Sequence, residues 1–170
     1  HPMPYLGQGE FYSEFGSYDV SITLPANYVV GSTGDLQTQS EIDFLEKKNK
    51  VTQSKKKSGQ FNRKPFVPGQ ERPKIDMRFP PSSAEVKTIR YIQKDIHDFA
   101  WFADKRFNVL KSSVDLPRHK RTVTSWAMFT NEHADLWQHS SVYLDSAIYY
   151  YSLWNGDYPY KQVTAVDGTI

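Results

Sequence analysis

Apolar and polar residues alternate strictly along residues 18–24. Tyr18, Val20, Ile22 and Leu24 share one face, and Asp19, Ser21 and Thr23 share the other. A period of two is typical of a half-buried β-strand. The turn residues 25–27 then lead to a second strand that runs from Tyr28 toward Thr33, and we expect these two strands to form an antiparallel pair.

A short helix and a long irregular stretch follow. Residues 40–48 fit the helix, with Ser40 as its N-cap and Ile42 and Leu45 on the inward side. Residues 49–83 contain five prolines and show no sustained period. A stretch of this length without secondary structure is uncommon inside a domain, so we interpret it as a flexible loop inserted between strands.

Regular alternation resumes at Glu85. Residues 85–93 predict a strand with apolar side chains on both faces, and residues 98–102 predict a second, strongly apolar strand. Residues 108–111 add a short third strand. The first 115 residues therefore predict a layer of antiparallel strands that is interrupted by one long loop.

The last third of the chain predicts a strand, a long helix and a second strand, at residues 122–129, 132–154 and 163–166. Asn131 is a fitting N-cap for the helix, and Gly156 is the expected stop in the left-handed αL conformation. The stripe expected to face inward is Leu136, Trp137, Ser140, Tyr143, Leu144, Ala147, Ile148, Tyr151 and Trp154. Strand, helix and strand together form the crossover unit of a layered α/β domain.

The composition narrows the class of protein. Hydrophobic residues make up 38%, below the usual globular share, while 11 Tyr, 10 Phe and 4 Trp suit β-rich layers. The chain contains no Cys, which excludes a disulfide framework and a thiolate metal site or nucleophile. No apolar run approaches the roughly 18 residues of a membrane-spanning helix, so we expect no membrane span.

The net charge of +2 conceals an uneven distribution. Residues 47–78 carry eleven Lys or Arg against two acidic residues, which gives this segment +9 and leaves −7 elsewhere. A nucleic-acid-binding arm and a solvated loop both fit such a charge. The lysines 55–57 lie among Ser, Gln, Asn, Gly and Pro, and Phe61 and Phe66 form no stacking pattern. We therefore favour the solvated loop and expect no specific nucleic-acid partner.

Four histidines are the candidate metal ligands: His97, His119, His133 and His139. None lies in an H-E-x-x-H pattern or has a partner four residues on. His133 and His139 are six residues apart and face different sides of a helix, so exposed helix histidines explain them better. His97 and Asp98 form either an acid/base pair or a strand-end pair that satisfies backbone groups, and we favour the second.

Other signatures of an active site are absent from the sequence. It contains no G-x-S-x-G, G-x-x-x-x-G-K-[ST] or G-x-G-x-x-G pattern, and the glycines of residues 7–10 lack a preceding strand. Glu132 and Asp135 favour the dipole at the start of the predicted helix, so a structural role suffices. The aromatic residues 143–154 fit a buried core better than a pocket. We therefore expect no catalytic, cofactor-binding or metal-binding residue in this chain.

Three stretches together resemble the gluzincin zinc aminopeptidases, a family that includes alanyl aminopeptidases and leukotriene hydrolase. Residues 15–25, 28–30 and 34–36 are similar to a strand pair of the family's N-terminal β-domain. Residues 96–104 are similar to a late strand of that domain in bacterial members. Residues 150–164 are similar to the start of the thermolysin-like catalytic domain, where a helix leads through a G-x-Y-P-Y turn into a strand.

The resemblance implies an α+β fold in two parts. Residues 1–115, with the basic loop 49–83, would belong to the antiparallel β-sheet layer of the N-terminal β-domain. Residues 116–170 would form the opening strand-helix-strand of the thermolysin-like α/β domain, and we place the boundary in the polar link 116–120. In the family, a Gly-rich Met-Glu loop that grips the free amino end of the substrate comes next, followed by H-E-x-x-H and a downstream Glu that bind zinc. No position of this sequence matches these motifs.

The resemblance therefore implies a non-catalytic fragment of a bacterial metallopeptidase that is periplasmic or secreted. Zinc and the peptide substrate would belong to the intact parent enzyme. We also expect a fragment because the chain stops just after the strand that ends near Gly168. Such a fragment would self-associate through its exposed C-terminal half. The alternative is a non-enzymatic β-rich module whose Tyr and Trp surface binds a peptide or a glycan.

Overall fold

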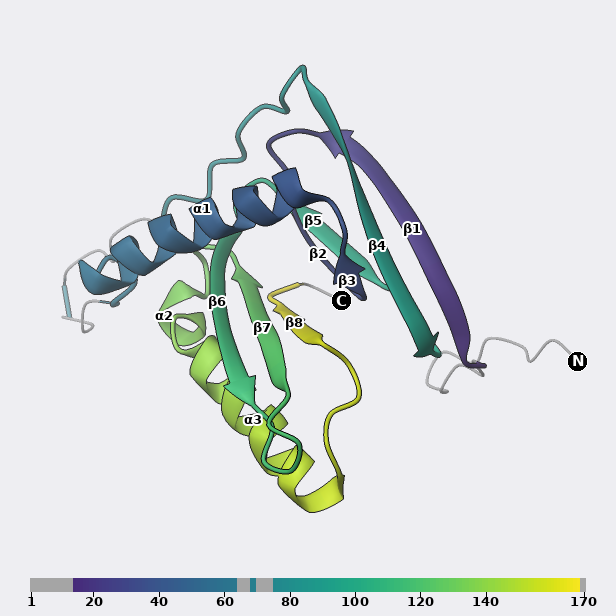
Figure 1. Ribbon diagram of the computed structural model, residues 1–170. Coiled ribbons are helices and arrows are strands. Elements are labelled where there is room, and N and C mark those ends of the chain that lie inside the picture. The colour runs from purple at the N-terminus through teal and green to yellow at the C-terminus, as the bar shows by residue number, and fades with distance from the viewer. Residues whose placement is uncertain (1–13, 64–67, 70–74, 169–170) are drawn as a thin grey trace, which may run out of the picture.

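Three small sheets and three helices make up the part of the chain that the computed structural model describes, residues 14–63, 68–69 and 75–168 (Figure 1). The first sheet has the order β1 (Gly16–Pro25), β4 (Val86–Ile96), β3 (Asp35–Leu36), with antiparallel pairing throughout. The second sheet pairs β2 (Val29–Ser32) with β5 (Trp101–Asp104), also antiparallel. The third has the order β6 (Asn108–Asp115), β7 (Thr122–Phe129), β8 (Gln162–Val166). This confirms an α+β fold with mostly antiparallel strands.

Strand β1 has the predicted alternation but not the predicted partner. Its polar positions are exposed, and Ile22 is buried. β1 pairs with β4, so that Thr23 lies opposite Thr88, whereas β2 pairs with β5. The expected antiparallel pair between the first two strands is therefore wrong. Because β2 is buried along its whole length, it lies between layers instead of extending the sheet that contains β1.

A glycine allows this burial of β2. A Cβ atom on Gly31 would lie 2.9 Å from both Met128 Sδ and Val166 Cγ2, closer than real Cβ atoms approach. Met128 is in β7 and Val166 is in β8. The absence of a side chain at Gly31 thus lets the backbone of β2 lie directly against the third sheet.

Helix α1 (Gln39–Lys57) is much longer than the helix predicted over residues 40–48, and Thr38 rather than Ser40 is its N-cap residue. Residues 49–57 are therefore helical, and the prediction that they belong to a loop is wrong. The helix has a weak apolar pattern, and its only fully buried large apolar side chain is Leu45. Its C-terminal half is held by polar contacts with a distant strand, which no local pattern shows.

These contacts cover the outer edge of β6. The backbone N–H of Val109 donates to Thr52 Oγ1 at 3.0 Å, and the N–H of Lys111 donates to Asn49 Oδ1 at 3.0 Å. Thr52 is buried. An uncovered strand edge exposes a row of unpaired backbone groups. Two side chains of α1 thus replace a neighbouring strand at this edge of the sheet.

The predicted strand-helix-strand unit is confirmed in the C-terminal part. β7 and β8 are parallel neighbours, with Trp126 opposite Thr164. β6 extends to Asp115, beyond the predicted residues 108–111, and forms an antiparallel pair with β7. The polar link 116–120 is therefore the connection between two paired strands. The domain boundary placed there stays a prediction.

The single helix predicted over residues 132–154 is two helices, α2 (Ala134–Trp137) and α3 (Ser140–Asn155), with Gln138 and His139 between them. Their N-cap residues are His133 and His139, so the prediction of Asn131 as the cap is wrong. Gly156 ends α3 as predicted, but its φ of 103° and ψ of 155° are not the αL conformation that was predicted for it. A positive φ of this kind is one that glycine adopts readily.

The buried face of α3 differs from the predicted stripe. Ile148 is buried as predicted, but the other buried residues of α3 are Ser141 and Ser152. Four members of the predicted stripe are exposed instead, namely Leu136, Tyr143, Tyr151 and Trp154. Small side chains let the helix approach the sheet closely, and Asp145 accepts a hydrogen bond from Ser112 of β6 at 3.0 Å. Most of the aromatic side chains consequently face away from the sheet.

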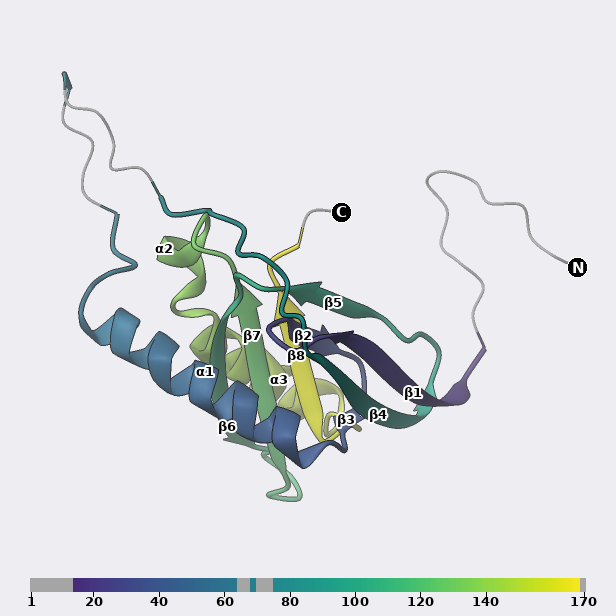
Figure 2. The same ribbon diagram turned by 90° about the horizontal axis from the view of Figure 1, so that it is seen from above.

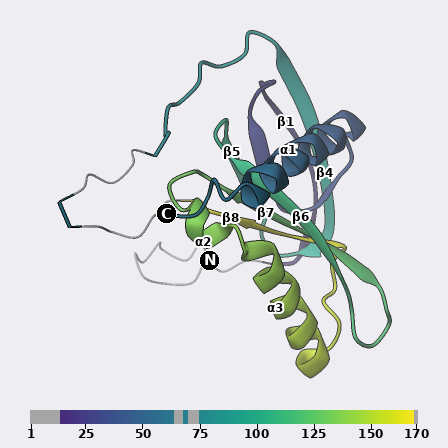
Figure 3. The same ribbon diagram turned by 90° about the vertical axis from the view of Figure 1, so that its left-hand side faces the viewer.

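The third sheet is the middle of three layers (Figure 3). On one face, Leu45 of α1 and Val29 of β2 pack against Val109, Trp126 and Met128. On the other face, α2 and α3 cover the sheet, and the buried cluster there includes Leu116, Val123 and Ile148. In the view from above, α1 lies in front of the third sheet and α3 passes behind β7 (Figure 2).

Part of the basic segment is irregular. Beyond α1, residues 58–63, 68–69 and 75–83 contain neither helix nor strand. Residues 64–67 and 70–74 lie outside the described ranges, so the predicted flexibility of this loop stays a prediction. No helix in the described ranges is long and apolar enough to cross a membrane.

The replacement Thr52→Val tests the covering of the β6 edge. It keeps the shape of the side chain but leaves the buried N–H of Val109 without an acceptor, so the free energy of unfolding should fall by about 1–3 kcal/mol. Urea denaturation followed by circular dichroism measures this loss. Thr52→Ser keeps the hydroxyl and should cost less, and Val51→Ala at an exposed position should change stability by at most about 0.5 kcal/mol. Equal losses in the Val and Ser variants would contradict the role of the hydroxyl.

Candidate functional site

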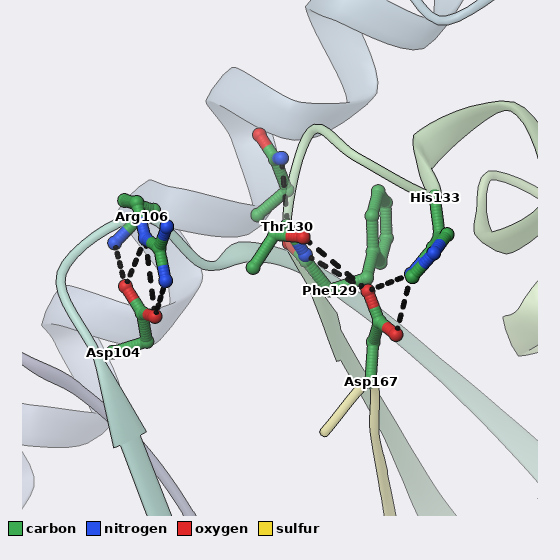
Figure 4. Close-up of polar contacts among 7 residues, drawn as sticks. Asp104, Arg106, Phe129, Thr130, His133 and Asp167 are labelled. Atoms are coloured by element: carbon green, nitrogen blue, oxygen red, sulfur yellow. Dashed lines mark hydrogen bonds and ion pairs between the residues drawn. The ribbon is translucent and has the colours of Figure 1, made fainter. Parts of the chain in front are cut away.

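The carboxyl ends of the parallel strands β7 and β8 bring polar side chains together (Figure 4). Thr130 and Asp167 are the first residues beyond these two strands, and the backbone N–H of Asp167 continues the pairing by donating to Met128 O at 2.8 Å. In α/β sheets, ligands bind preferentially beyond the carboxyl ends of parallel strands. A ligand-binding site is therefore expected at this edge of the sheet.

The Asp167 carboxylate is the centre of this cluster. Its Oδ2 accepts hydrogen bonds of 3.4 Å from both the backbone N–H and the hydroxyl of Thr130. Nδ1 of His133 lies 3.0 Å from Oδ1. The Asp167 side chain is mostly buried, whereas the His133 side chain is 47% exposed. The contact with Nδ1 determines the orientation of the partly exposed imidazole ring.

A second ion pair stabilises the neighbouring turn between β5 and β6 (Figure 4). Arg106 Nη2 lies 2.5 Å from Asp104 Oδ2, and the backbone N–H of Arg106 donates to Asp104 Oδ1 at 2.7 Å. Burial raises the pKa of Asp104, but the hydrogen bonds and the charge of Arg106 outweigh burial and hold this pKa below its ordinary value. The carboxylate and the guanidinium satisfy each other, which indicates a structural role.

A hollow of about 290 Å³ lies between β8 and the other two sheets. Its lining has no charged residue and comprises Gly31, Ser32, Thr33, Gly34, Gln93, Ile96, Ala100, Phe102, Tyr158, Tyr160, Gln162, Val163, Thr164 and Val166. Gln162, one of these lining residues, donates from its side-chain amide to the carbonyls of Ser32 and Gly34. Burial, with the charge of Tyr160 as a second cause, raises the pKa of the Tyr158 phenol, so this group stays neutral. The hollow suits an uncharged ligand.

Three of the four histidines considered as metal ligands are paired with aspartates, each with a different one. Nδ1 of His97 lies 2.7 Å from Asp98 Oδ2, and both side chains are largely exposed. His119 contacts Asp157, His133 contacts Asp167, and His139 precedes α3. In the part of the chain that the structure describes, no group of three or more His, Cys, Asp or Glu could hold a metal ion.

The His97–Asp98 pair lies in the connection between β4 and β5, where the His97 carbonyl accepts a hydrogen bond of 3.3 Å from the Tyr18 hydroxyl. This backbone contact is of the kind expected for the strand-end interpretation. The two acidic residues predicted at a helix start are also placed by the structure. Asp135 lies in the first turn of α2 and pairs with Arg63 at 2.9 Å, and the Glu132 carbonyl accepts a hydrogen bond from the same arginine.

The His119–Asp157 pair joins the loop after β6 to the turn after α3. Asp157 Oδ2 lies 2.7 Å from His119 Nδ1 and accepts the backbone N–H of His119 at 3.2 Å. Burial raises the pKa of Asp157, but the hydrogen bonds from His119 outweigh burial and lower this pKa overall. The two loops are 38 residues apart in sequence, so the sequence analysis missed Asp157.

Asp167 and Thr130 were also missed as site residues. The only signal for them was their position directly after the two predicted strands of the crossover unit. The glycines of residues 7–10 lie outside the described ranges. In the basic segment, Lys55 donates to Asn108 Oδ1 at 2.9 Å, so this lysine is attached to β6.

The loss of folding stability at low pH should depend on the Asp104–Arg106 ion pair. Because the pKa of Asp104 is lowered in the folded chain, its contribution to stability is present above the ordinary pKa of 3.8 and is lost as the pH falls through the lower, folded-state pKa. Asp104→Asn should therefore show a flatter fall in the urea midpoint between about pH 5 and pH 2 than the unmodified chain. Arg106→Gln removes the cause of the lowered pKa and should flatten the curve as well. Identical slopes in all three proteins would contradict this assignment.

Comparison with known proteins assigns no family to this chain. No protein-family model matches its sequence, and no curated protein matches it. What the chain can do therefore rests on its residues and on the geometry of the carboxyl-end cluster and the hollow.

Proposed function

We propose that this chain is the junction between the N-terminal β-domain and the thermolysin-like catalytic domain of a bacterial gluzincin zinc aminopeptidase. The observation that carries the proposal is the C-terminal crossover unit. A helix, α3, leads through the turn 156–161 into β8, which lies parallel to the strand that precedes the helix. The resemblance of residues 150–164 implies this arrangement at the start of the catalytic domain.

The residues that carry the resemblance also determine the geometry of the turn. The backbone N–H of Tyr158 donates to Ser152 Oγ at 3.0 Å, which ties the turn to the last turns of α3. The Tyr158 hydroxyl donates to Gln162 O at 3.3 Å, at the start of β8. Arg121, just before β7, donates to the carbonyls of Tyr158 and Tyr160. These contacts attach the turn 156–161 to α3, to β8 and to the start of β7. A structural role of the turn, in orienting β8 against β7, is therefore supported.

The strands before residue 116 fit the first part of the proposal. β1, β3, β4 and the pair β2–β5 form antiparallel sheets, as expected for an N-terminal β-domain. β6 pairs with β7, so the two proposed parts share a sheet at the boundary. The close approach of Gly31 to β8 adds a second contact between them.

The described residues do not fit a zinc site, and we assign them no catalytic step. In this proposal, zinc supplies an activated water to hydrolyse the N-terminal peptide bond of a substrate, and its ligands lie in other parts of the parent enzyme, which is periplasmic or secreted. The contribution of this chain is positional. The contacts of Asp167 with Thr130 and His133 attach the end of β8 to the segment that follows β7.

A second candidate function has one observation in its favour. Exposed aromatic side chains gather on α3, where the rings of Tyr150 and Trp154 contact each other in a tilted arrangement at a centroid distance of 5.6 Å and Trp154 is 69% exposed. Exposed aromatic surfaces of this kind bind peptides and glycans. A non-enzymatic binding module is therefore the alternative to the peptidase proposal.

The coding sequence downstream of Ile170 tests the peptidase proposal. It should encode a Gly-rich Met-Glu loop, then H-E-x-x-H and a further Glu. The full-length product should hydrolyse aminoacyl p-nitroanilides, lose this activity on chelation and regain it with Zn²⁺. Replacing the Glu of H-E-x-x-H by Gln should lower kcat by about 100-fold or more. The 170-residue chain, assayed alongside, should contain no stoichiometric zinc and show no activity. A reading frame without these motifs would contradict the proposal.

The aromatic face of α3 should make the 170-residue chain self-associate. This face comprises Val142, Tyr143, Tyr149, Tyr150, Tyr151, Leu153 and Trp154, all exposed, and large apolar patches commonly drive association. Light scattering over a range of concentrations should show a mass that rises with concentration. The double variant Tyr150→Ser, Trp154→Ser should remain monomeric, whereas Val86→Ser, at an exposed position on β4, should behave like the unmodified chain. A chain that is monomeric at every concentration would contradict this prediction.

A further inference from the structure

Asn155 and Gly156 form the only Asn-Gly pair of the sequence, and they lie at the end of α3. Asn155 is the last residue of the helix and is exposed. The other five asparagines, at positions 27, 49, 62, 108 and 131, each precede a residue that has a side chain. Because glycine lacks a Cβ atom, the backbone nitrogen that follows Asn155 is the least hindered of the six.

The space around Gly156 is open. Apart from its own chain neighbours, no heavy atom of the described chain lies within 4 Å of the place that a Cβ on Gly156 would take. The φ of 103° and ψ of 155° of this residue lie in a region that only glycine occupies readily. A ring closed between the Asn155 side chain and the Gly156 nitrogen therefore meets no steric obstacle.

Two hydrogen bonds of the last helical turn oppose the closure of such a ring. The N–H of Gly156 donates to Ser152 O at 3.1 Å, and Asn155 Nδ2 donates to Tyr151 O at 3.3 Å. Helix ends open locally at a low cost in free energy. Opening of this one turn releases both the backbone nitrogen and the side-chain amide.

We propose that Asn155 is a site of self-modification, at which the side-chain amide is converted to a carboxylate. The Gly156 nitrogen loses its proton to water and forms a bond with Cγ of Asn155. The bond between Cγ and Nδ2 then breaks, and the amide takes up a proton and leaves as ammonia. Water adds to the resulting succinimide, which opens at Cγ to give aspartate or at the main-chain carbonyl to give isoaspartate. The reaction consumes water and releases ammonia, and it needs no other reactant.

The product alters the turn that connects α3 to β8. A negative charge at position 155 is unfavourable, because it faces the negative end of the helix dipole. Isoaspartate also adds a carbon to the main chain just before the turn 156–161, where the N–H of Tyr158 donates to Ser152 Oγ at 3.0 Å. Conversion of Asn155 should therefore loosen the attachment of this turn to α3.

Peptide mapping by mass spectrometry tests the modification. The purified chain is incubated at mildly alkaline pH, which favours loss of the amide proton from the Gly156 nitrogen. The peptide that contains Asn155 should gain the mass difference between an amide and an acid at least about tenfold faster than any peptide with another Asn. Asn155→Gln keeps the amide but lengthens the side chain, so it should abolish the conversion at this position and leave the other five asparagines unchanged.

Hydrogen exchange followed by NMR tests the structural effect. In the converted chain, the backbone amide of Tyr158 should exchange about tenfold faster than in the unconverted chain. The Val109 amide, which Thr52 holds at the distant edge of the sheet, should be unchanged. Asn155→Asp carries the new charge without the extra main-chain carbon and should therefore have a smaller effect on Tyr158.

Two results would overturn the proposed modification. One is conversion at Asn155 that is no faster than at the other asparagines. The other is an Asn155 amide that persists in the folded chain while a synthetic peptide of residues 150–160 loses it under the same conditions, since the helix end would then prevent the reaction. Equal exchange of the Tyr158 amide before and after conversion would contradict the loosening of the turn.

Discussion

Helix α1 connects the two larger sheets through buried polar contacts that must be paired. At its N-terminal end, Glu41 is almost fully buried and forms an ion pair with Lys87 of β4, with 2.6 Å between Oε2 and Nζ. Lys87 also donates to the Tyr28 carbonyl at 2.7 Å and lies over the ring of Phe44. Burial raises the pKa of Glu41, and the hydrogen bond and charge of Lys87 oppose this rise. A buried charge without its partner is costly, so helix and strand hold each other in place.

The same helix stabilises the third sheet at its other end. Thr52 and Asn49 satisfy the edge of β6, and Lys111 pairs with Glu46. In the described part of the chain, β8 is the other edge strand of this sheet and lies beside the neutral hollow.

The polar pairs around the third sheet hold the turns and loops at the ends of its strands. Asp104–Arg106 closes the turn after β5, and His119–Asp157 joins the loop after β6 to the turn after α3, although the buried Asp157 Oδ1 has no hydrogen-bond partner among the described residues. The Asp167 cluster holds the carboxyl end of β8, and its histidine, like His119, is partly or largely exposed. This pattern fits a chain whose side chains orient backbone segments, which agrees with the proposed positional role.

Local patterns determined a large part of the fold. The alternation in β1, the crossover order of strand, helix and strand, and the helix end at Gly156 depend on residues close in sequence, and the structure has all three. Periodicity records which face of an element is apolar, so it predicts the type of element well. For α3, however, serines rather than aromatic residues form much of the buried face, and the pattern of apolar residues was misleading.

Only the tertiary structure decided the pairings and the sites. β1 pairs with β4 across the whole length of α1 and the basic segment, and residues 49–57 are helical because Asn49 and Thr52 meet a strand more than fifty residues away. The Asp167 cluster and the neutral hollow exist because separate segments converge on one sheet. A local sequence pattern cannot predict such hydrogen bonds, because the two residues that form each of them are far apart in the sequence.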